Sequence, residues 1–125
     1  MNTKKVERFE DLIARQKSRE LTKKVCQFTE RGNFAGDFGL KSQIQMASVS
    51  VISNIAKGFE RFRPNKFHQF LLIAKGSCAE VRSQLYVAFD AGYLQENDFN
   101  ELKSTTKELS KIINGLRSYI EQQKK

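Results

Sequence analysis

The chain has 125 residues, which is enough for one domain that buries its core without disulfides or metals. Its formal net charge of +8, from 22 Lys and Arg against 14 Asp and Glu, favours a polyanionic or acidic partner. No apolar run approaches the roughly 20 residues that span a bilayer, and no secretory signal is visible, so we expect a cytoplasmic protein without membrane contact.

The first predicted helix covers about residues 11–30. Its apolar residues recur at helical spacing: Leu21, Val25 and Phe28. Lys23 and Lys24 lie off this stripe, so they belong either to a solvated face or to a basic contact surface. Residues 31–37 contain two glycines and an asparagine and are predicted to form a loop. Asp37 is then suited to cap the following helix.

A second helix is predicted over residues 38–59. Its main apolar stripe consists of Leu40, Ile44, Ala47, Val51 and Ile55. Met46, Val49 and Ile52 widen this stripe, so the helix needs more than one neighbour. Gly58 stands near its end, where it provides either a left-handed residue or a close helix contact.

Two more helices are predicted over residues 64–91 and 96–121. Pro64 suits the first turn of the third helix, and Gly92 is typical of the position after its last turn. The third helix has an apolar seam at a spacing of mostly three or four: Phe67, Phe70, Leu71, Ala74, Cys78, Val81, Leu85 and Ala88. Four long helices with short connections predict an all-α fold, an antiparallel up-down-up-down four-helix bundle. We expect residues 1–125 to form this single domain.

A polar network is predicted between the second and third helices. Asn54 adjoins the apolar stripe, and Ser50 lies one turn earlier on the same face. Glu80 and Gln84 lie one turn apart on the third helix. A buried amide needs hydrogen-bond partners, so we expect these four side chains to fix the register of the two helices without doing chemistry.

A basic elbow, residues 60–66, joins the second and third helices. Here and just beyond, basic residues alternate with phenylalanines: Arg61, Phe62, Arg63, Lys66 and Phe67. Cations contact phosphates and rings stack on unpaired bases, which is what binding RNA or a single strand requires. The alternative is an ordinary solvated turn whose phenylalanines cap the core. The full set of candidate nucleic-acid-binding residues is Arg61, Arg63, Lys66, Lys57, Lys41, Lys23 and Lys24.

Catalysis and metal binding have little support in the sequence. His68 is the only histidine and has no companion at metal-ligand spacing. Cys26 and Cys78 form no CxxC pair, and each is predicted to be a reduced core residue. We therefore expect no enzymatic activity, no metal site and no cofactor.

Two sequence patterns carry a family resemblance. The pattern S-x-x-x-N-I-A-x-G is matched by Ser50, Asn54, Ile55, Ala56 and Gly58. The pattern G-S-x-A-E followed by Q-L is matched by Gly76, Ser77, Ala79, Glu80, Gln84 and Leu85. With these patterns the chain resembles the small bacterial four-helix-bundle proteins encoded within intervening sequences of 23S ribosomal RNA genes. That family is similar in turn to the accessory variability proteins of diversity-generating retroelements.

The resemblance implies a bundle that assembles into a ring, a homopentamer, with a basic surface suited to nucleic acid. Retroelement relatives work beside a reverse transcriptase, which the resemblance makes a candidate partner. The chain departs from the family pattern on the second helix. Gln45 and Met46 replace two arginines, Ile52 replaces a proline and Lys57 replaces a glutamate. These changes weaken the case for a family-style basic contact there and give the elbow more weight.

Two functions remain open from the sequence. The first is an oligomeric protein that binds RNA or DNA, as an accessory to a reverse transcriptase or to ribosomal RNA. The second is a protein-interaction scaffold that binds no nucleic acid, with the charge serving only solubility. Self-association is expected in either case, because too many phenylalanines are present to fill one thin bundle. These are Phe28, Phe34, Phe38, Phe59, Phe62 and Phe89.

Overall fold

The computed structural model describes the backbone of residues 2–61 and 63–123 and the side chains of residues 13–60 and 63–122. Within these residues the chain is helical and contains no strand. Its helices are α1 (Asn2–Thr29), α2 (Gly32–Gly36), α3 (Phe38–Arg61), α4 (Pro64–Asp90) and α5 (Glu96–Gln123). The prediction of an all-helical fold is confirmed.

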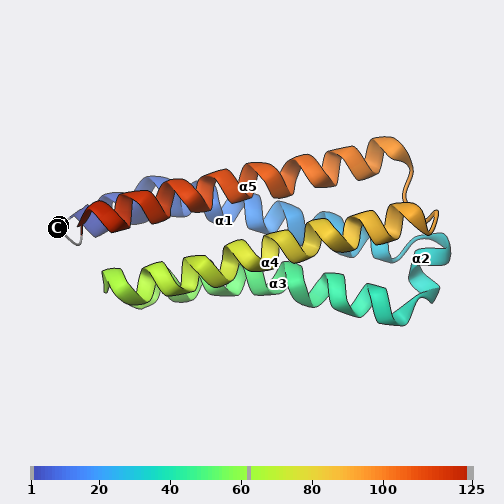
Figure 1. Cartoon of the computed structure of the whole chain (residues 1–125), viewed down its shortest axis with the longest axis horizontal. Coiled ribbons are helices and arrows are strands. Elements are labelled where there is room, and N and C mark those ends of the chain that lie inside the picture. Colours follow the sequence, from blue (N-terminus) through green and yellow to red (C-terminus); the bar gives the residue numbers. More distant parts are fainter. Residues whose placement is uncertain (1, 62, 124–125) are drawn as a thin grey trace.

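The four long helices lie side by side, and each runs opposite to the long helix before it (Figure 1). The most extensive contacts are between α3 and α4, followed by α4 with α5. Helix α1 completes the arrangement by packing on both α3 and α5. The α3–α4 connection therefore lies at the same end of the molecule as the end of α5 (Figure 1).

The core is built from the apolar stripes that the sequence predicts. Phe70 of the predicted α4 seam is half-buried, and the other members are fully buried: Phe67, Leu71, Ala74, Cys78, Val81, Leu85 and Ala88. Facing it, α3 buries Ile44, Ala47, Val51, Ile55 and Phe59. Each Val, Leu, Ile or Phe side chain among them that is removed from water contributes on the order of 1.5–3 kcal/mol, so packing of amphipathic faces dominates the stability of the fold.

The helix ends follow their predicted chemistry. The backbone N–H of Leu40 donates to Asp37 Oδ1 at 3.1 Å, which confirms Asp37 as the cap of α3. Pro64 lies in the first turn of α4, and Gly92 adopts a φ of +82° after its end. The hydroxyl of Tyr93 also donates to Asp37 Oδ2 at 2.9 Å. This bond ties the start of α3 to the end of α4.

Gly58 permits the closest contact between α3 and α4. It lies inside α3, which continues to Arg61, and a Cβ added to it would lie 2.9 Å from Cδ1 of Phe67. No side chain fits at that distance without moving the ring. Of the two roles predicted for this glycine, close helix contact is the one found.

The structure corrects three predictions. The segment predicted as a loop contains the short helix α2, because Phe34 is buried and draws this stretch onto the core. Helix α1 begins at Asn2 instead of near residue 11, since the Lys, Glu and Arg residues of this stretch are good helix formers. Cys26 is exposed, because it lies one position beyond the buried stripe residue Val25.

The other predicted core cysteine, Cys78, is buried. Burial raises the pKa of its thiol to about 11, so it stays protonated at neutral pH.

The phenylalanines divide between core and surface. Phe34 and Phe59 are buried, and Phe28 and Phe89 pack partly buried against the core. Phe38, in contrast, is 76% exposed. Phe62 lies outside the described residues, so the packing argument for self-association now depends on Phe38 and on other exposed apolar side chains.

Candidate nucleic-acid interface

Within the basic elbow, Arg63 has extended backbone just before α4. Helix α3 ends at Arg61, and α4 starts at Pro64. A residue before proline is restricted to extended backbone, and Arg63 has φ −94° and ψ 126°. Arg63 and Lys66 are both exposed. The side chain of Arg61 and all of Phe62 lie outside the described residues, so the predictions for them stay predictions.

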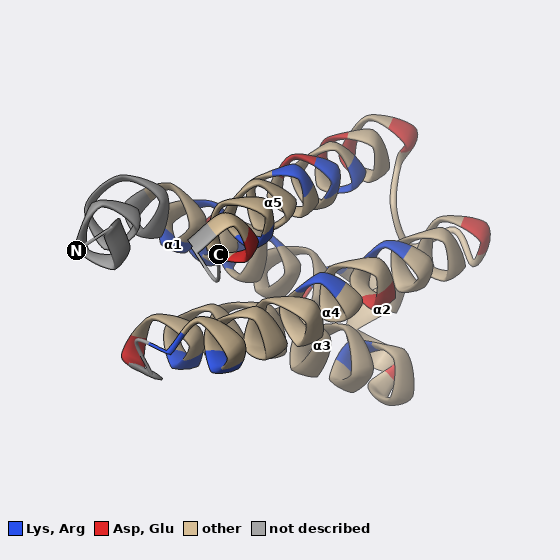
Figure 2. Ribbon diagram, turned by 60° about the vertical axis from the view of Figure 1, so that its left-hand side comes forward, with Lys and Arg blue, Asp and Glu red and all other residues tan. Residues whose placement is uncertain are grey.

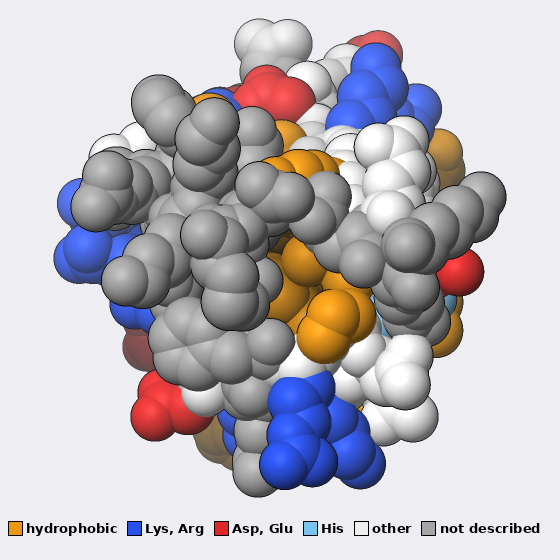
Figure 3. All heavy atoms as spheres, turned by 90° about the vertical axis from the view of Figure 1, so that its left-hand side faces the viewer, with side chains coloured by type: hydrophobic (Ala, Val, Ile, Leu, Met, Phe, Trp, Pro, Cys, Tyr) orange, Lys and Arg blue, Asp and Glu red, His pale blue; other side chains and the backbone are white. Residues whose placement is uncertain are grey.

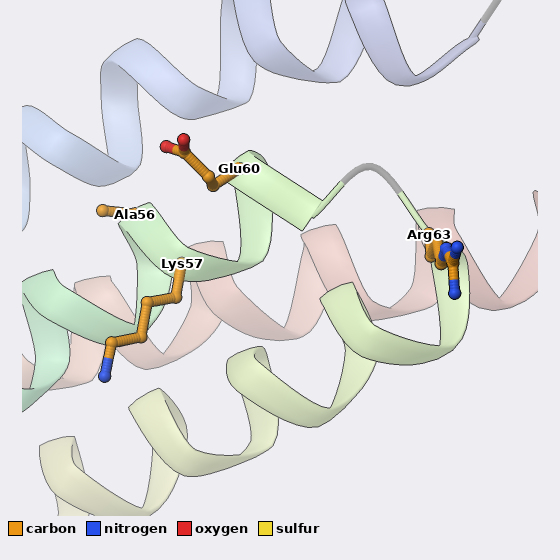
Figure 4. Close-up of a pocket in the computed structure, with 4 residues that line it drawn as sticks. All are labelled: Ala56, Lys57, Glu60 and Arg63. Carbon is orange, nitrogen blue, oxygen red and sulfur yellow. The ribbon is translucent and has the colours of Figure 1, made fainter.

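Lys57 extends the basic surface onto the last turns of α3. It is exposed and lines a surface pocket together with Ala56, Glu60 and Arg63. Figure 4 shows Lys57 and Glu60 extending to different sides of α3, with Arg63 across the connection. Two cations therefore border this pocket, Lys57 from α3 and Arg63 from the connection to α4.

Phe67 is not available to stack on a base. It is fully buried and meets Phe59 edge to face, with ring centroids 4.6 Å apart. The prediction that its ring alternates with the elbow cations on the surface is therefore wrong. Its position at the first turn of the α4 seam turns it inward, as in the alternative of a turn whose rings cap the core.

The elbow cations have no anionic partner within the described structure. Among the described side chains, no carboxylate forms an ion pair with Lys57, Arg63 or Lys66. Figure 2 shows Lys and Arg segments close together near the α3–α4 connection. Figure 3 shows basic side chains gathered at the lower edge of this end of the molecule, over α3 and α4. Their charge is therefore directed to solvent.

Other candidate lysines are already paired. Lys24 Nζ lies 2.7 Å from Glu101 on α5 and 3.0 Å from Glu20 on its own helix. The hydrogen bond to Glu101 is the main reason why the pKa of Lys24 is raised. Lys41 Nζ lies 2.9 Å from Glu30. These two lysines must give up a carboxylate before they can bind a phosphate.

The seven candidate cations do not form one surface. Lys41 stands near the start of α3, roughly 24 Å along the helix axis from Lys57. Lys23 is exposed on α1, where it lines a separate pocket with Gln16, Arg19 and Glu20. Of the described candidates, only Lys57, Arg63 and Lys66 are brought together at the α3–α4 end.

The polar network forms with a different partner on α4. Asn54 Nδ2 donates to the Ser50 carbonyl at 2.8 Å and to Ser50 Oγ at 3.2 Å. Ser50 Oγ then shares a 2.8 Å hydrogen bond with Ser77 Oγ. Sequence reasoning missed Ser77, although it is part of the G-S-x-A-E pattern. The network links the two helices but contains no titratable group.

Glu80 does not belong to this network, and its predicted place beside Asn54 is wrong. It is exposed, and the register of the two helices places it far from Asn54. Because α3 and α4 run in opposite directions, the Ser50–Ser77 pair places Asn54 level with residue 73. Glu80 lies level with residue 47, roughly 10 Å further along the axis. Gln84 is half-buried, and its Oε1 has no partner within the described residues.

The described part of the chain shows neither a metal cluster nor a membrane span. None of its helices combines the length and apolar character needed to cross a bilayer. No three His, Cys, Asp or Glu side chains among the described residues gather closely enough to hold a metal ion.

Fold and surface together define a small all-helical protein with a solvent-directed basic end. A model of the family described as 23S rRNA-intervening sequence protein matches residues 10–115. The chain belongs to this 23S rRNA-intervening sequence protein family. No curated protein sequence matches it significantly.

A solved structure supports the fold. It is the crystal structure of a protein with unknown function from the S23 ribosomal protein family of Bacteroides thetaiotaomicron VPI-5482. The match has a TM-score of 0.81 and covers 88% of this chain and 99% of that chain, at 18% sequence identity. At that identity the likeness concerns the fold alone.

Proposed function

We propose that the protein is a non-enzymatic basic protein that binds RNA or DNA through the α3–α4 end. The observation that carries this proposal is the group of exposed cations Lys57, Arg63 and Lys66, which lack a carboxylate partner among the described side chains. Binding a phosphate there releases condensed counterions without breaking an existing ion pair. In this proposal the four long helices act as one antiparallel up-down-up-down bundle that holds the basic end rigid.

The family supports RNA as the first ligand to test. Its description connects it with intervening sequences of 23S rRNA. We propose that the chain meets its nucleic acid in the cytoplasm, as an accessory to ribosomal RNA or to a reverse transcriptase of the retroelement type. A ribosomal RNA gene or a reverse transcriptase gene around the coding sequence would separate these two settings.

A salt titration tests the proposal. Binding to a single-stranded RNA, a single-stranded DNA and a duplex DNA is measured by fluorescence anisotropy between 50 and 300 mM salt. Combining Lys57→Gln, Arg63→Gln and Lys66→Gln is expected to weaken binding. It should also lower the salt slope for single strands by roughly 2, since each lost phosphate contact removes about 0.7.

A matched control separates a local site from a general effect of charge. Combining Lys103→Gln, Lys107→Gln and Lys111→Gln removes three charges from α5 and should change the slope little. Equal losses in the two triple variants would contradict an elbow site. If the wild type bound none of the three nucleic acids, the result would contradict the proposal and favour the alternative, a protein-interaction scaffold that binds no nucleic acid.

A second candidate function is favoured by an exposed apolar face on α3 and α4. Its α3 residues are Phe38, Met46 and Val49, which are 76%, 69% and 47% exposed. Its α4 residues are Ile73 and Val87, which are 51% and 54% exposed. Soluble monomers keep such patches small, so we propose that this face joins copies of the chain into a ring, a homopentamer.

Multi-angle light scattering tests the assembly. The wild type should elute as an oligomer of one size, and combining Met46→Glu with Val49→Glu should give smaller species. Lys111→Glu, which also changes an exposed residue, is the control and should leave the mass unchanged. A monomeric wild type would contradict the ring.

A further inference from the structure

A polar pocket lies beside the elbow, between the start of α4 and the end of α5. It is lined by His68, Asn114, Arg117, Ser118, Glu121 and Gln122. His68 follows Lys66 by two residues, so the pocket and the elbow share the first turns of α4. The two side chains lie on different flanks of this helix, separated by roughly its 10 Å diameter. A strand that crosses the start of α4 can therefore reach both.

Arg117 provides hydrogen-bond donors to this pocket. Its Nη1 donates to Asn114 Oδ1 at 3.1 Å, which holds the guanidinium against α5. Its Nε–H is buried and has no acceptor within the described residues. A guanidinium has five N–H donors, so an acceptor that a ligand brings can bind those that Asn114 does not use.

Glu121 provides acceptors one turn further along α5. Its Oε2 lies 3.7 Å from His68 Nδ1, which is longer than a hydrogen bond. A carboxylate offers about four acceptor sites, so Glu121 can accept from a ligand beside the partners it already has. The Glu121 side chain is 56% exposed and can be reached from solvent. Its spacing from Arg117 places both groups on one face of the helix.

A guanidinium beside a carboxylate complements the edges of guanine. Guanine offers O6 and N7 as acceptors, which arginine binds, and its N1–H and amino group donate to a carboxylate. Adenine has a donor in place of O6 and no N1–H. A phosphate has only acceptors and would be repelled by Glu121. His68 adds a ring of the kind on which unpaired bases stack.

We propose that this pocket binds an unpaired guanine base of a strand whose phosphates lie on the elbow. The proposal rests on the nucleic-acid binding proposed above and adds a base preference to it. The elbow cations set the affinity for any strand, and Arg117 and Glu121 set the preference for guanine.

The preference is tested with two ten-nucleotide RNAs that consist of uridine except for one central guanine or adenine. The guanine RNA is expected to bind on the order of tenfold more tightly, the discrimination typical of one good pair of base contacts. Glu121→Gln should remove most of this preference while leaving the adenine RNA unaffected. Lys57→Gln should weaken both RNAs equally. Glu96→Gln, at the opposite end of α5, is the control and should retain the preference.

Equal binding of the two RNAs by the wild type would overturn the guanine site and leave the elbow proposal intact. A guanine preference that survived Glu121→Gln in full would also overturn it, because this carboxylate is the proposed acceptor for the N1–H and amino group of guanine. A direct NMR titration covers the case in which no RNA binds and the proposed function itself fails. His68 is the only histidine, so its imidazole signals need no assignment. They should shift with guanosine monophosphate and not with adenosine monophosphate, and no shift with the former overturns the site.

Discussion

Basic side chains along α1 and basic side chains at the elbow differ in what faces them. Lys17 and Lys24 of α1 reach Glu108 and Glu101 of α5 at 2.6 and 2.7 Å. Lys57, Arg63 and Lys66 have no such partner among the described residues. The net charge of +8 is therefore a poor guide to where a polyanion binds. What decides is whether a cation has already been neutralised by the fold.

The same contrast appears in how each region is held. The α1–α5 contact uses ion pairs between side chains that are only partly buried, which contribute little each. The elbow is fixed by the apolar packing of α3 on α4 beneath it, including the contact of Gly58 with Phe67. Unpaired cations above tightly packed helices favour a binding surface at the elbow. The weak ion pairs between α1 and α5, in contrast, favour a role in aligning these two helices.

The largest expected effect comes from disturbing the apolar packing of α3 on α4 beneath the elbow. Gly58→Leu forces a side chain into the Phe67 ring, where even a Cβ would lie 2.9 Å away. Overpacking of this kind costs roughly 1–3 kcal/mol, which thermal or urea unfolding would measure. The variant should also weaken RNA binding, because the elbow cations are displaced together with the end of α3.

Gly76→Ala is the control for this change. Gly76 lies in a helix with nothing within 4 Å of an added Cβ, so alanine should stabilise the fold by about 0.5–1 kcal/mol. If Gly58→Leu unfolded at the wild-type temperature, the close contact would not be what holds the elbow.

The α3–α4 region also shows how far sequence could lead. Periodicity was enough to predict the buried seam of α4, and turn chemistry was enough for Asp37 and Gly92, because these features depend on neighbouring residues. Sequence alone could not predict that Ser77, and not Glu80, is the α4 residue that joins the polar network, since this depends on the register between two helices. Only a known cross-helix contact supplies that register.

The candidate site was less predictable than the fold for the same reason. The elbow cations adjoin one another in sequence, so their proximity could be expected. The ion pair between Lys24 and Glu101 joins residues far apart in the chain, and no local pattern in either helix predicts it. The pocket between His68 and Arg117 likewise requires the packing of α4 on α5. Local patterns locate cations, and tertiary packing decides which remain free.

An intermediate effect is expected from the polar link between the middle parts of α3 and α4. Ser77→Ala removes the 2.8 Å hydrogen bond to Ser50 and should cost about 1 kcal/mol in unfolding experiments. Asn54→Leu tests the register directly, because it removes the amide that braces Ser50. It should melt lower or change the oligomer. A variant that melts higher with an unchanged oligomer would show that the network does not set register.

The smallest effect is expected at the α1–α5 contact. Glu101→Gln removes the carboxylate 2.7 Å from Lys24 and should cost about 0.2–1 kcal/mol, as is usual for a partly exposed pair. The loss should fade in 1 M salt, where charges are screened within roughly 3 Å. Because the change also frees Lys24, RNA binding should tighten slightly. Unchanged or weaker binding would break the comparison between paired and unpaired cations.

The pKa of Lys24 determines how the α1–α5 contact depends on pH. Within α1, a hydrogen bond from Lys24 lowers the pKa of Glu20 from its ordinary 4.5, so the stabilisation by that pair is lost only as Glu20 protonates at lower pH, in wild type and in Glu101→Gln alike. The pKa of Lys24 is raised from 10.5, mainly by its hydrogen bond to Glu101, so stabilisation is lost only as pH rises above that range. The difference in unfolding free energy between wild type and Glu101→Gln should thus be present below pH 10.5 and shrink as Lys24 loses its proton at higher pH. A difference that persisted after Lys24 had lost its charge, above the range of its raised pKa, would mean that packing, and not charge, joins α1 to α5, and the lysines of α1 would then be as free to meet a polyanion as those of the elbow.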